Sequence, residues 1–373
     1  MELKNTPIAE IISRRALLKG IAAGAVASGF ASGGISLAAA PASSFGFEEI
    51  EHGIDDMHHV AKGYTADVFL GWGDALQKDM PPADASNMKP GLQEKQFGYN
   101  NDFVAFMPLP LGSQNSDHGL LCVNHEYPNP ELMFSGEIGL NEVGVQIAAL
   151  GHSVVEIRKD GKKWRVVVGS PFNRRITGET KIKISGPAAG ADRLKTSADK
   201  AGMEVLGTLA NCSGGVTPWG TVLSGEENFP WYFSGEPPEA EAVNFKRLEL
   251  GGHSKYHWEK FHSRFDIDKE PNEANRFGWV TEINPYDPKA APVKRTALGR
   301  FKHEAATCAI APDGRVAVYM GDDSQFEYIY KFVTKNKFNP SDRAANFDLL
   351  DEGTLYVAKF LQDGKMKWLP LVF

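Results

Sequence analysis

Short runs of β-branched and aromatic residues recur along the chain, each bounded by Gly, Pro, Asn or Asp. They cover residues 103–106, 119–123, 153–157, 164–168, 279–283 and 316–320, a pattern typical of short β-strands. The dipeptides Asp160-Gly161, Asp313-Gly314 and Asp363-Gly364 lie between paired strand candidates and favour tight hairpin turns. We therefore expect an all-β protein, with a β-propeller built from hairpins favoured over a β-sandwich.

Helical patterns are few. Apolar spacing predicts a helix within residues 131–151 and a weaker one within 198–206, which is not the alternation of a parallel α/β sheet. No strict repeat of the WD40 or kelch kind is visible. Residues 234–275 are polar and irregular, so we expect a long surface insertion. The last segment, 365–373, follows a turn as a strand and then stops, and we expect a propeller that is incomplete at its C-terminus.

The first forty residues resemble an export signal. Arg14 and Arg15 lie within Ser13–Lys19 and lead into a weakly apolar stretch that ends on the small residues before Pro41. The paired arginines match a twin-arginine signal, which predicts export in the folded state by the twin-arginine machinery. We expect cleavage after Ala40, no stable membrane anchor, a periplasmic or extracellular location, and one domain over residues 41–373.

Charge and cysteine content narrow the function classes. The formal charge is -7, with 47 acidic and 40 basic residues, and the absence of a basic block gives no sign of nucleic-acid binding. Three cysteines, at Cys122, Cys212 and Cys308, are too few for a disulfide framework. A free thiol is usually buried and inert, and otherwise can ligate a metal.

Polar residues at the ends of apolar strands are the first candidates for a functional site. Asp102 precedes the strand at 103–106. In the segment 120–127, alternation places Cys122, Asn124 and Glu126 on one face of a strand. A thiolate suits iron or zinc and oxygen ligands suit calcium, so this face permits a mixed-metal site; a buried Cys with a solvated Glu is the alternative.

Two further segments carry paired charges. Glu226 and Glu227 follow a strand, and adjacent carboxylates are costly to bury unless a cation offsets their repulsion. Their neighbouring glycines predict tight packing around the turn. In the segment 299–306, Glu304 lies beside Arg300 and Lys302, which suits a carboxylate on a metal and a cation on a phosphate. The competing interpretation is an acidic pair on the surface for Glu226 and Glu227, and a salt-bridged surface turn for residues 299–306.

Taken in order, these segments resemble the PhoX family of secreted alkaline phosphatases. The resemblance rests on Asn100-Asn101-Asp102-Phe103, Asn124-His125-Glu126-Tyr127, Thr217–Thr221 with Glu226-Glu227-Asn228, the Arg300–Ala305 segment and Met320–Asp323. It covers about residue 46 to the end of the chain.

The resemblance implies a six-bladed propeller that hydrolyses small phosphomonoesters at a cluster of Fe3+ and Ca2+, for phosphate acquisition. It implies that Cys122 is the iron thiolate, that Glu304 and one of Glu226 and Glu227 bind iron or calcium, and that Lys302 contacts phosphate. The weaker ligand candidates are Asp102, Asn124, Glu126 and Glu137. Because family members usually run further, more metal ligands are expected beyond residue 373.

A non-catalytic, exported propeller that binds calcium and a partner protein is the alternative function. A thiolate ligand separates the two hypotheses, since calcium gains nothing from sulfur and iron does.

Overall fold

The computed structural model describes residues 49–81 and 83–372, so the predicted leader at 1–40 lies outside the described residues. The chain divides into two units, one ending at Asp67 and the other beginning at Val68. Every helix and strand described here belongs to the second unit. Among the described residues, no helix has the length and apolar character that crossing a bilayer requires.

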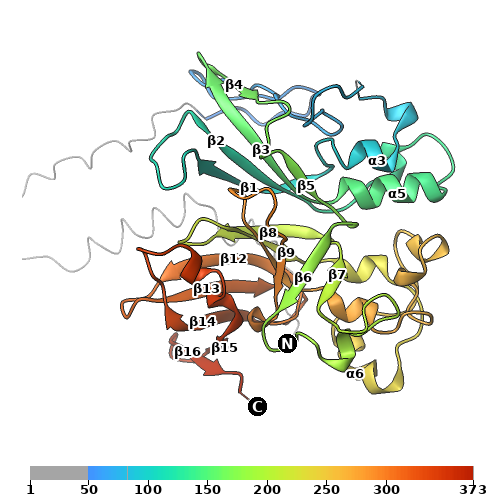
Figure 1. The fold of residues 1–373 in the computed structure, drawn as a ribbon, viewed down its shortest axis with the longest axis vertical. Helices are drawn as coiled ribbons and strands as arrows, with labels where there is room; N and C mark the ends of the chain where they lie inside the picture. Colours follow the sequence, from blue (N-terminus) through green and yellow to red (C-terminus); the bar gives the residue numbers. More distant parts are fainter. Residues whose placement is uncertain (1–48, 82, 373) are drawn as a thin grey trace, which may run out of the picture. The chain divides into compact units, whose positions relative to one another are not determined.

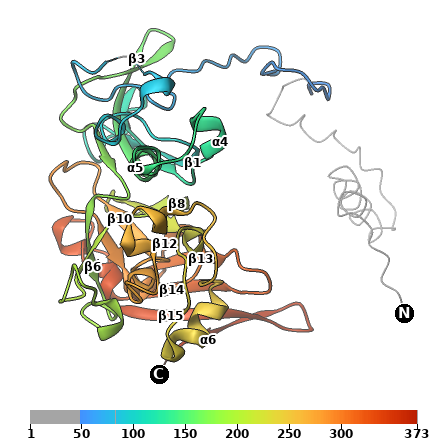
Figure 2. The ribbon, with the colours of Figure 1, turned by 90° about the vertical axis from the view of Figure 1, so that its right-hand side faces the viewer.

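The strands of the second unit form three sheets (Figures 1 and 2). The first has the order β1-β2-β3-β4, with β5 also paired to β3, and the second has the order β7-β6-β11-β10-β9-β8. The third is a meander from β12 to β16. Strands β6 and β11 pair in parallel, whereas the other pairings of the described strands are antiparallel. The expected class, mostly sheet with few helices, is confirmed.

The strand bounds are as follows: β1 Asn101–Pro108, β2 His118–His125, β3 Gly151–Asp160, β4 Lys163–Val166, β5 Arg174–Ile176, β6 Lys181–Ser185, β7 Glu204–Leu206, β8 Asn211–Val216, β9 Val222–Glu226, β10 Val280–Ile283, β11 Val293–Arg295, β12 His303–Ile310, β13 Arg315–Asp322, β14 Ile329–Lys337, β15 Gly353–Phe360 and β16 Met366–Pro370. All six expected strands are present. The three Asp-Gly turns join β3 to β4, β12 to β13 and β15 to β16, with each glycine at positive φ.

The α-helices are α3 Pro90–Gln93, α4 Pro130–Met133, α5 Leu140–Ala149 and α6 Ala242–Arg247. The helix expected within 131–151 is thus divided, and α5 begins where the Glu142 carboxylate accepts a hydrogen bond of 3.0 Å from the Gly139 N–H. The helix expected within 198–206 is wrong. Asp199 accepts backbone hydrogen bonds from Ala201, Met203 and Glu204, which holds a loop that leads into β7.

The expected surface insertion at 234–275 is also wrong in part. The segment contains α6 and short 3-10 turns, as predicted for irregular chain, but Phe245, Trp258 and Phe265 are fully buried. They belong to the largest apolar core, which also contains Leu120 of β2 and Val222 of β9. Apolar residues widely spaced in a polar segment gave no periodic signal, which explains the error.

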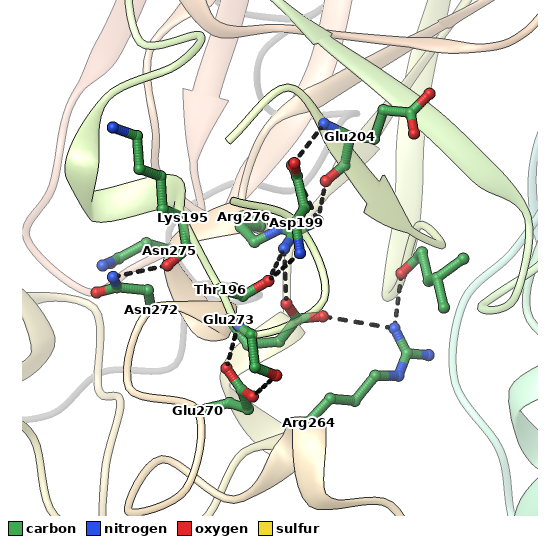
Figure 3. A network of polar contacts seen from close by, with 12 residues as sticks. Lys195, Thr196, Asp199, Glu204, Arg264, Glu270, Asn272, Glu273, Asn275 and Arg276 are labelled. Carbon is green, nitrogen blue, oxygen red and sulfur yellow. Dashed lines mark hydrogen bonds and ion pairs between the residues drawn. The ribbon is translucent and has the colours of Figure 1, made fainter. Parts of the chain in front are cut away.

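A polar network fastens the end of this segment to the loop before β7 (Figure 3). Arg276 is buried, and it hydrogen bonds the Thr196 hydroxyl at 2.5 Å and pairs with Glu273 at 3.3 Å. Arg264 approaches the same Glu273 at 3.6 Å. Two cations around one buried carboxylate offset its desolvation cost. The network therefore holds the chain in place just ahead of β10.

Candidate metal centre

The same strand pairing recurs at one end of each sheet. Asn101 of β1 pairs with His125 of β2, Asn211 of β8 with Glu226 of β9, and His303 of β12 with Asp322 of β13. In each pair, both following residues carry a candidate ligand: Asp102 and Glu126, Cys212 and Glu227, and Glu304 and Asp323. We call these six residues the acidic cluster.

Backbone geometry also repeats. The N–H groups of Glu126, Glu227 and Asp323 donate hydrogen bonds of 3.0, 3.0 and 3.1 Å to the carbonyls of Asn100, Ala210 and Lys302. Each carbonyl belongs to the residue just before its pair. The register of all three strand pairs then shifts within three residues, as at a β-bulge. Each sheet therefore presents two side chains from fixed backbone positions.

Strand β8 lies between β1 and β12, which brings the three pairs together (Figure 1). Glycines permit the close approach: a Cβ on Gly215 would lie 2.1 Å from the Ala306 carbonyl oxygen, and one on Gly225 would lie 2.8 Å from that of His303. The expectation that Gly215 marks tight packing is confirmed.

Cys212 occupies the middle of the acidic cluster. Its Sγ lies 3.4 Å from Asp102 Oδ2 and 3.6 Å from Glu304 Oε1. Two groups of potential ligand atoms share this sulfur, one with Asp102 and Glu126 and the other with Glu227 and Glu304, and the atoms of each group lie within 4.8 Å of one another. This spacing suits cations that share one thiolate ligand.

The electrostatics of the acidic cluster are unfavourable without a cation. Burial, together with Asp102 and Glu304, raises the pKa of Glu126 to about 7. Burial and contact with Asp323 raise the pKa of Glu227 to about 8. Burial and the surrounding carboxylates raise the pKa of the Cys212 thiol, and burial and neighbouring acids raise that of Glu304. Cations would reverse these shifts by attracting the ionised forms.

The structure brings together four of the residues that the sequence singled out, namely Asp102, Glu126, Glu227 and Glu304. It places Cys122 elsewhere: this residue is fully buried in the apolar core, pairs in register with Ala105 and Val154, and has a thiol pKa that burial raises to about 12. The expectation that Cys122 and Glu126 share a ligand face fails because Glu126 lies beyond the end of β2, outside the alternation of the strand.

Asn124 is fully buried and its amide joins two sheets. The Nδ2 group donates to the Cys212 carbonyl and, at 3.2 Å, to that of Ser213, while Oδ1 accepts from His152 Nδ1 at 2.7 Å and from the Ser224 hydroxyl at 2.9 Å. Every polar atom of the side chain is thus engaged. Asn124 positions the backbone of Cys212 and does not point a free oxygen at the acidic cluster.

The structure also separates the two adjacent glutamates. Glu226 is fully buried and pairs with Lys294 at 2.8 Å, and its carboxylate accepts backbone hydrogen bonds from Leu209, Gly278 and Trp279. Glu227 alone joins the acidic cluster. Glu226 is the last residue of β9, whereas Glu227 lies just beyond that strand, as Glu126 lies just beyond β2.

The remaining candidates lie apart from the acidic cluster in their side-chain contacts. The Lys302 ammonium pairs with Glu249. The Arg300 guanidinium donates 2.8 Å hydrogen bonds to the carbonyls of Phe277 and Ala274. Glu137 is exposed in the segment between α4 and α5.

Sequence reasoning missed Cys212 and Asp323 as members of the acidic cluster. Both residues stand out only when the three strand pairs are aligned. Cys212 then takes the position of Asp102 and Glu304. Asp323 takes the position of Glu126 and Glu227. Because the aligned residues differ in chemistry, the repeat is not visible as a sequence repeat.

Comparisons with known proteins identify the family of the chain. The family model described as alkaline phosphatase PhoX matches residues 45–373. Among solved structures, Pseudomonas fluorescens PhoX in complex with vanadate, a transition state analogue, is similar at 43% identity with a TM-score of 0.79. The alignment covers 84% of this chain and 56% of that one, so this chain spans little more than half the length of its structural relative. No curated protein matches the sequence. The chain belongs to the PhoX alkaline phosphatase family.

Proposed function

We propose that this protein hydrolyses small phosphomonoesters at a cluster of Fe3+ and Ca2+ held by the acidic cluster, and that it serves phosphate acquisition. The observation that carries the proposal is the convergence of five carboxylates and one thiol from three sheets, in a chain of the PhoX family. Support also comes from the vanadate complex of the P. fluorescens relative.

The donor set fits such ions. Cys212 offers a soft sulfur ligand suited to iron, and Asp102, Glu126, Glu227 and Glu304 offer the oxygen ligands that calcium prefers. Bound cations would supply Lewis-acid stabilisation of the charge that develops on a transferred phosphoryl group. The chain fixes the ligands on strand ends and just beyond them, and Asn124 holds the Cys212 backbone, so the donors need little reorganisation.

The thiol in the acidic cluster favours the phosphatase over the calcium-binding alternative, because a site for calcium alone gains nothing from sulfur. Cys212, instead of the Cys122 expected from the resemblance, is the proposed iron ligand. Lys302 stays a proposed phosphate contact, which requires its ammonium to leave Glu249.

We further propose that the three sheets are blades of a β-propeller and that the leader at 1–40 directs twin-arginine export to the periplasm or cell exterior. Replacement of Arg14 and Arg15 by lysine followed by cell fractionation tests export. Retention of the protein in the cytoplasm is expected, and unchanged export would contradict the proposal.

The central experiment is metal analysis of protein purified without chelator, with hydrolysis of a chromogenic phosphomonoester measured with and without a calcium chelator. We expect iron and calcium to co-purify and turnover to depend on calcium. Glu304→Gln should remove turnover, whereas Glu352→Gln, at an exposed surface pair with Lys335, should leave it unchanged. Protein that binds calcium alone and shows no turnover would support the calcium-binding alternative.

A further inference from the structure

Arg300 belongs to a motif of the sequence, yet its side chain lies outside the acidic cluster. It lines a cavity of about 250 Å³ that is also bounded by Arg193, Arg247 and Asn275, with Leu194 and Leu248 among its apolar walls. None of the lining residues belongs to the acidic cluster. The cavity is therefore a separate feature that the phosphatase site does not explain.

The charges around this cavity do not balance. Arg193 forms a two-bond pair with Glu241 at 2.5 Å, and Arg247 pairs with Glu327 at 2.7 and 3.2 Å. Arg300 has no carboxylate within 4 Å among the described residues and contacts two backbone carbonyls instead. Burial and the nearby Arg193 lower the pKa of Arg300 to about 9. Three guanidinium groups and two carboxylates leave one net positive charge, and a partly buried cation without a counter-ion favours an anion.

Asn275 lines the same cavity. The residue is 2% exposed, and its Oδ1 atom is buried without a hydrogen-bond partner among the described residues. Its Nδ2 donates to the Arg193 carbonyl at 3.3 Å, and its own carbonyl accepts from Trp279 Nε1 at 3.1 Å, which fixes the side chain at the edge of the network in Figure 3. A buried acceptor left unpaired destabilises the fold, so a donor on a ligand would recover stability.

We propose that this cavity binds a small anion that also carries one hydrogen-bond donor, with the anionic group on Arg300 and the donor on Asn275 Oδ1. The volume lies below the roughly 300–1,000 Å³ of sites for drug-sized ligands, which favours a small occupant. The shared chemistry is met by a short hydroxycarboxylate and by hydrogenphosphate. The inference does not depend on the proposed phosphatase activity.

Two matched pairs of probes test it by calorimetry on the full chain, with and without added iron and calcium. Lactate carries a hydroxyl that propionate lacks, and hydrogenphosphate carries an O–H donor that sulfate lacks. We expect the donor-bearing member of at least one pair to bind at least tenfold more tightly, irrespective of the metals, and the pair that responds identifies the ligand class. A response that appears only with added metals would assign it to the acidic cluster and overturn the inference.

Variants separate the two contacts. Asn275→Leu should lower the affinity for the donor-bearing probe to that for the other member of its pair. Arg300→Met should lower the affinity for both members about tenfold or more, and Arg300→Lys should retain part of the binding. Arg315→Met, at an exposed pair with Asp313, is the control and should change nothing. If Arg300→Met does not fold, Asn275→Leu and the wild-type ratios decide. Equal affinity within both pairs, or no binding at tens of millimolar, would overturn the inference.

Discussion

Lys294 Nζ lies 2.8 Å from Glu226 Oε1, and neither side chain is exposed to solvent. Among the residues that the structure describes, the neighbouring Glu227 pairs with no such cation, and it instead contacts carboxylates from two other sheets. Two glutamates that are adjacent in sequence therefore have opposite electrostatic environments: one pairs with a cation of the protein, and the other lies among acids where we propose a bound ion.

Glu226→Ala should destabilise the protein strongly, because it leaves the Lys294 ammonium buried without a partner. The expected loss is about 3–5 kcal/mol in the free energy of unfolding, measured by urea denaturation. Replacement of both residues, as Glu226→Leu with Lys294→Met, should recover most of that loss. A single variant as stable as wild type would show that the pair contributes nothing.

Glu227→Gln should have the opposite effect on metal-free protein. The raised pKa of Glu227 means that its ionised form is disfavoured in the fold, so removal of the charge should stabilise by on the order of 1–2 kcal/mol at pH 8 or above. The same change should reduce the bound metal per chain. Stabilisation without metal loss would remove Glu227 from the set of ligands.

Cys212→Ser and Cys122→Ser should differ in metal content. Cys212→Ser should lower bound iron, measured by elemental analysis, because its sulfur is the one shared by both ligand groups. Cys122→Ser should leave iron unchanged and cost roughly 1 kcal/mol or more of stability, because it places a hydroxyl in the apolar core. The reverse pattern would restore Cys122 as the iron ligand.

Asn124→Leu should weaken metal binding without removing any proposed ligand. The variant loses the bonds from Nδ2 to the backbone of Cys212 and Ser213, and partners that orient ligands typically contribute 10–100-fold to metal affinity. Competition with a chelator measures the effect. Gln77→Leu, which removes a bond to the Asn173 carbonyl distant in sequence from the ligands, is the control.

Acid should destabilise the fold through buried histidines. Burial lowers the pKa of His152 and of His303 to about 3, against an ordinary value of 6.5. The unfolded chain thus binds more protons between these values, so stability is fully present above about pH 6.5 and falls by up to about 1.4 kcal/mol per pH unit and histidine as pH drops toward 3.

Urea denaturation from pH 7 to 4.5 tests this. His152→Gln, which cannot titrate in this range, should reduce the slope of stability against pH, whereas the exposed His257→Gln should leave it unchanged. Equal slopes for wild type and His152→Gln would show that His152 is not held neutral.

The strands were predictable because local alternation and Asp-Gly turns act within a few residues, and β13 and β16 formed where expected. The sequence did not predict which strands pair with one another. Parallel pairing of β6 with β11 and the core position of Trp258 depend on contacts across long stretches of chain. The site was predictable to the extent that Asp102, Glu126, Glu227 and Glu304 lie at strand ends. Cys212 was missed because only the three-dimensional alignment of strand pairs distinguishes its thiol from that of Cys122.

Because one strand pair recurs in three sheets, the proposed metal loading would report whether those sheets have docked. Each sheet alone offers two donors, below the four that zinc commonly takes and the six to eight that calcium takes. A chain with one sheet folded, or with sheets not yet docked, would hold an ion only weakly. The cations proposed for this site would thus stabilise the docked arrangement of the three sheets selectively, and the last sheet to dock would complete the site.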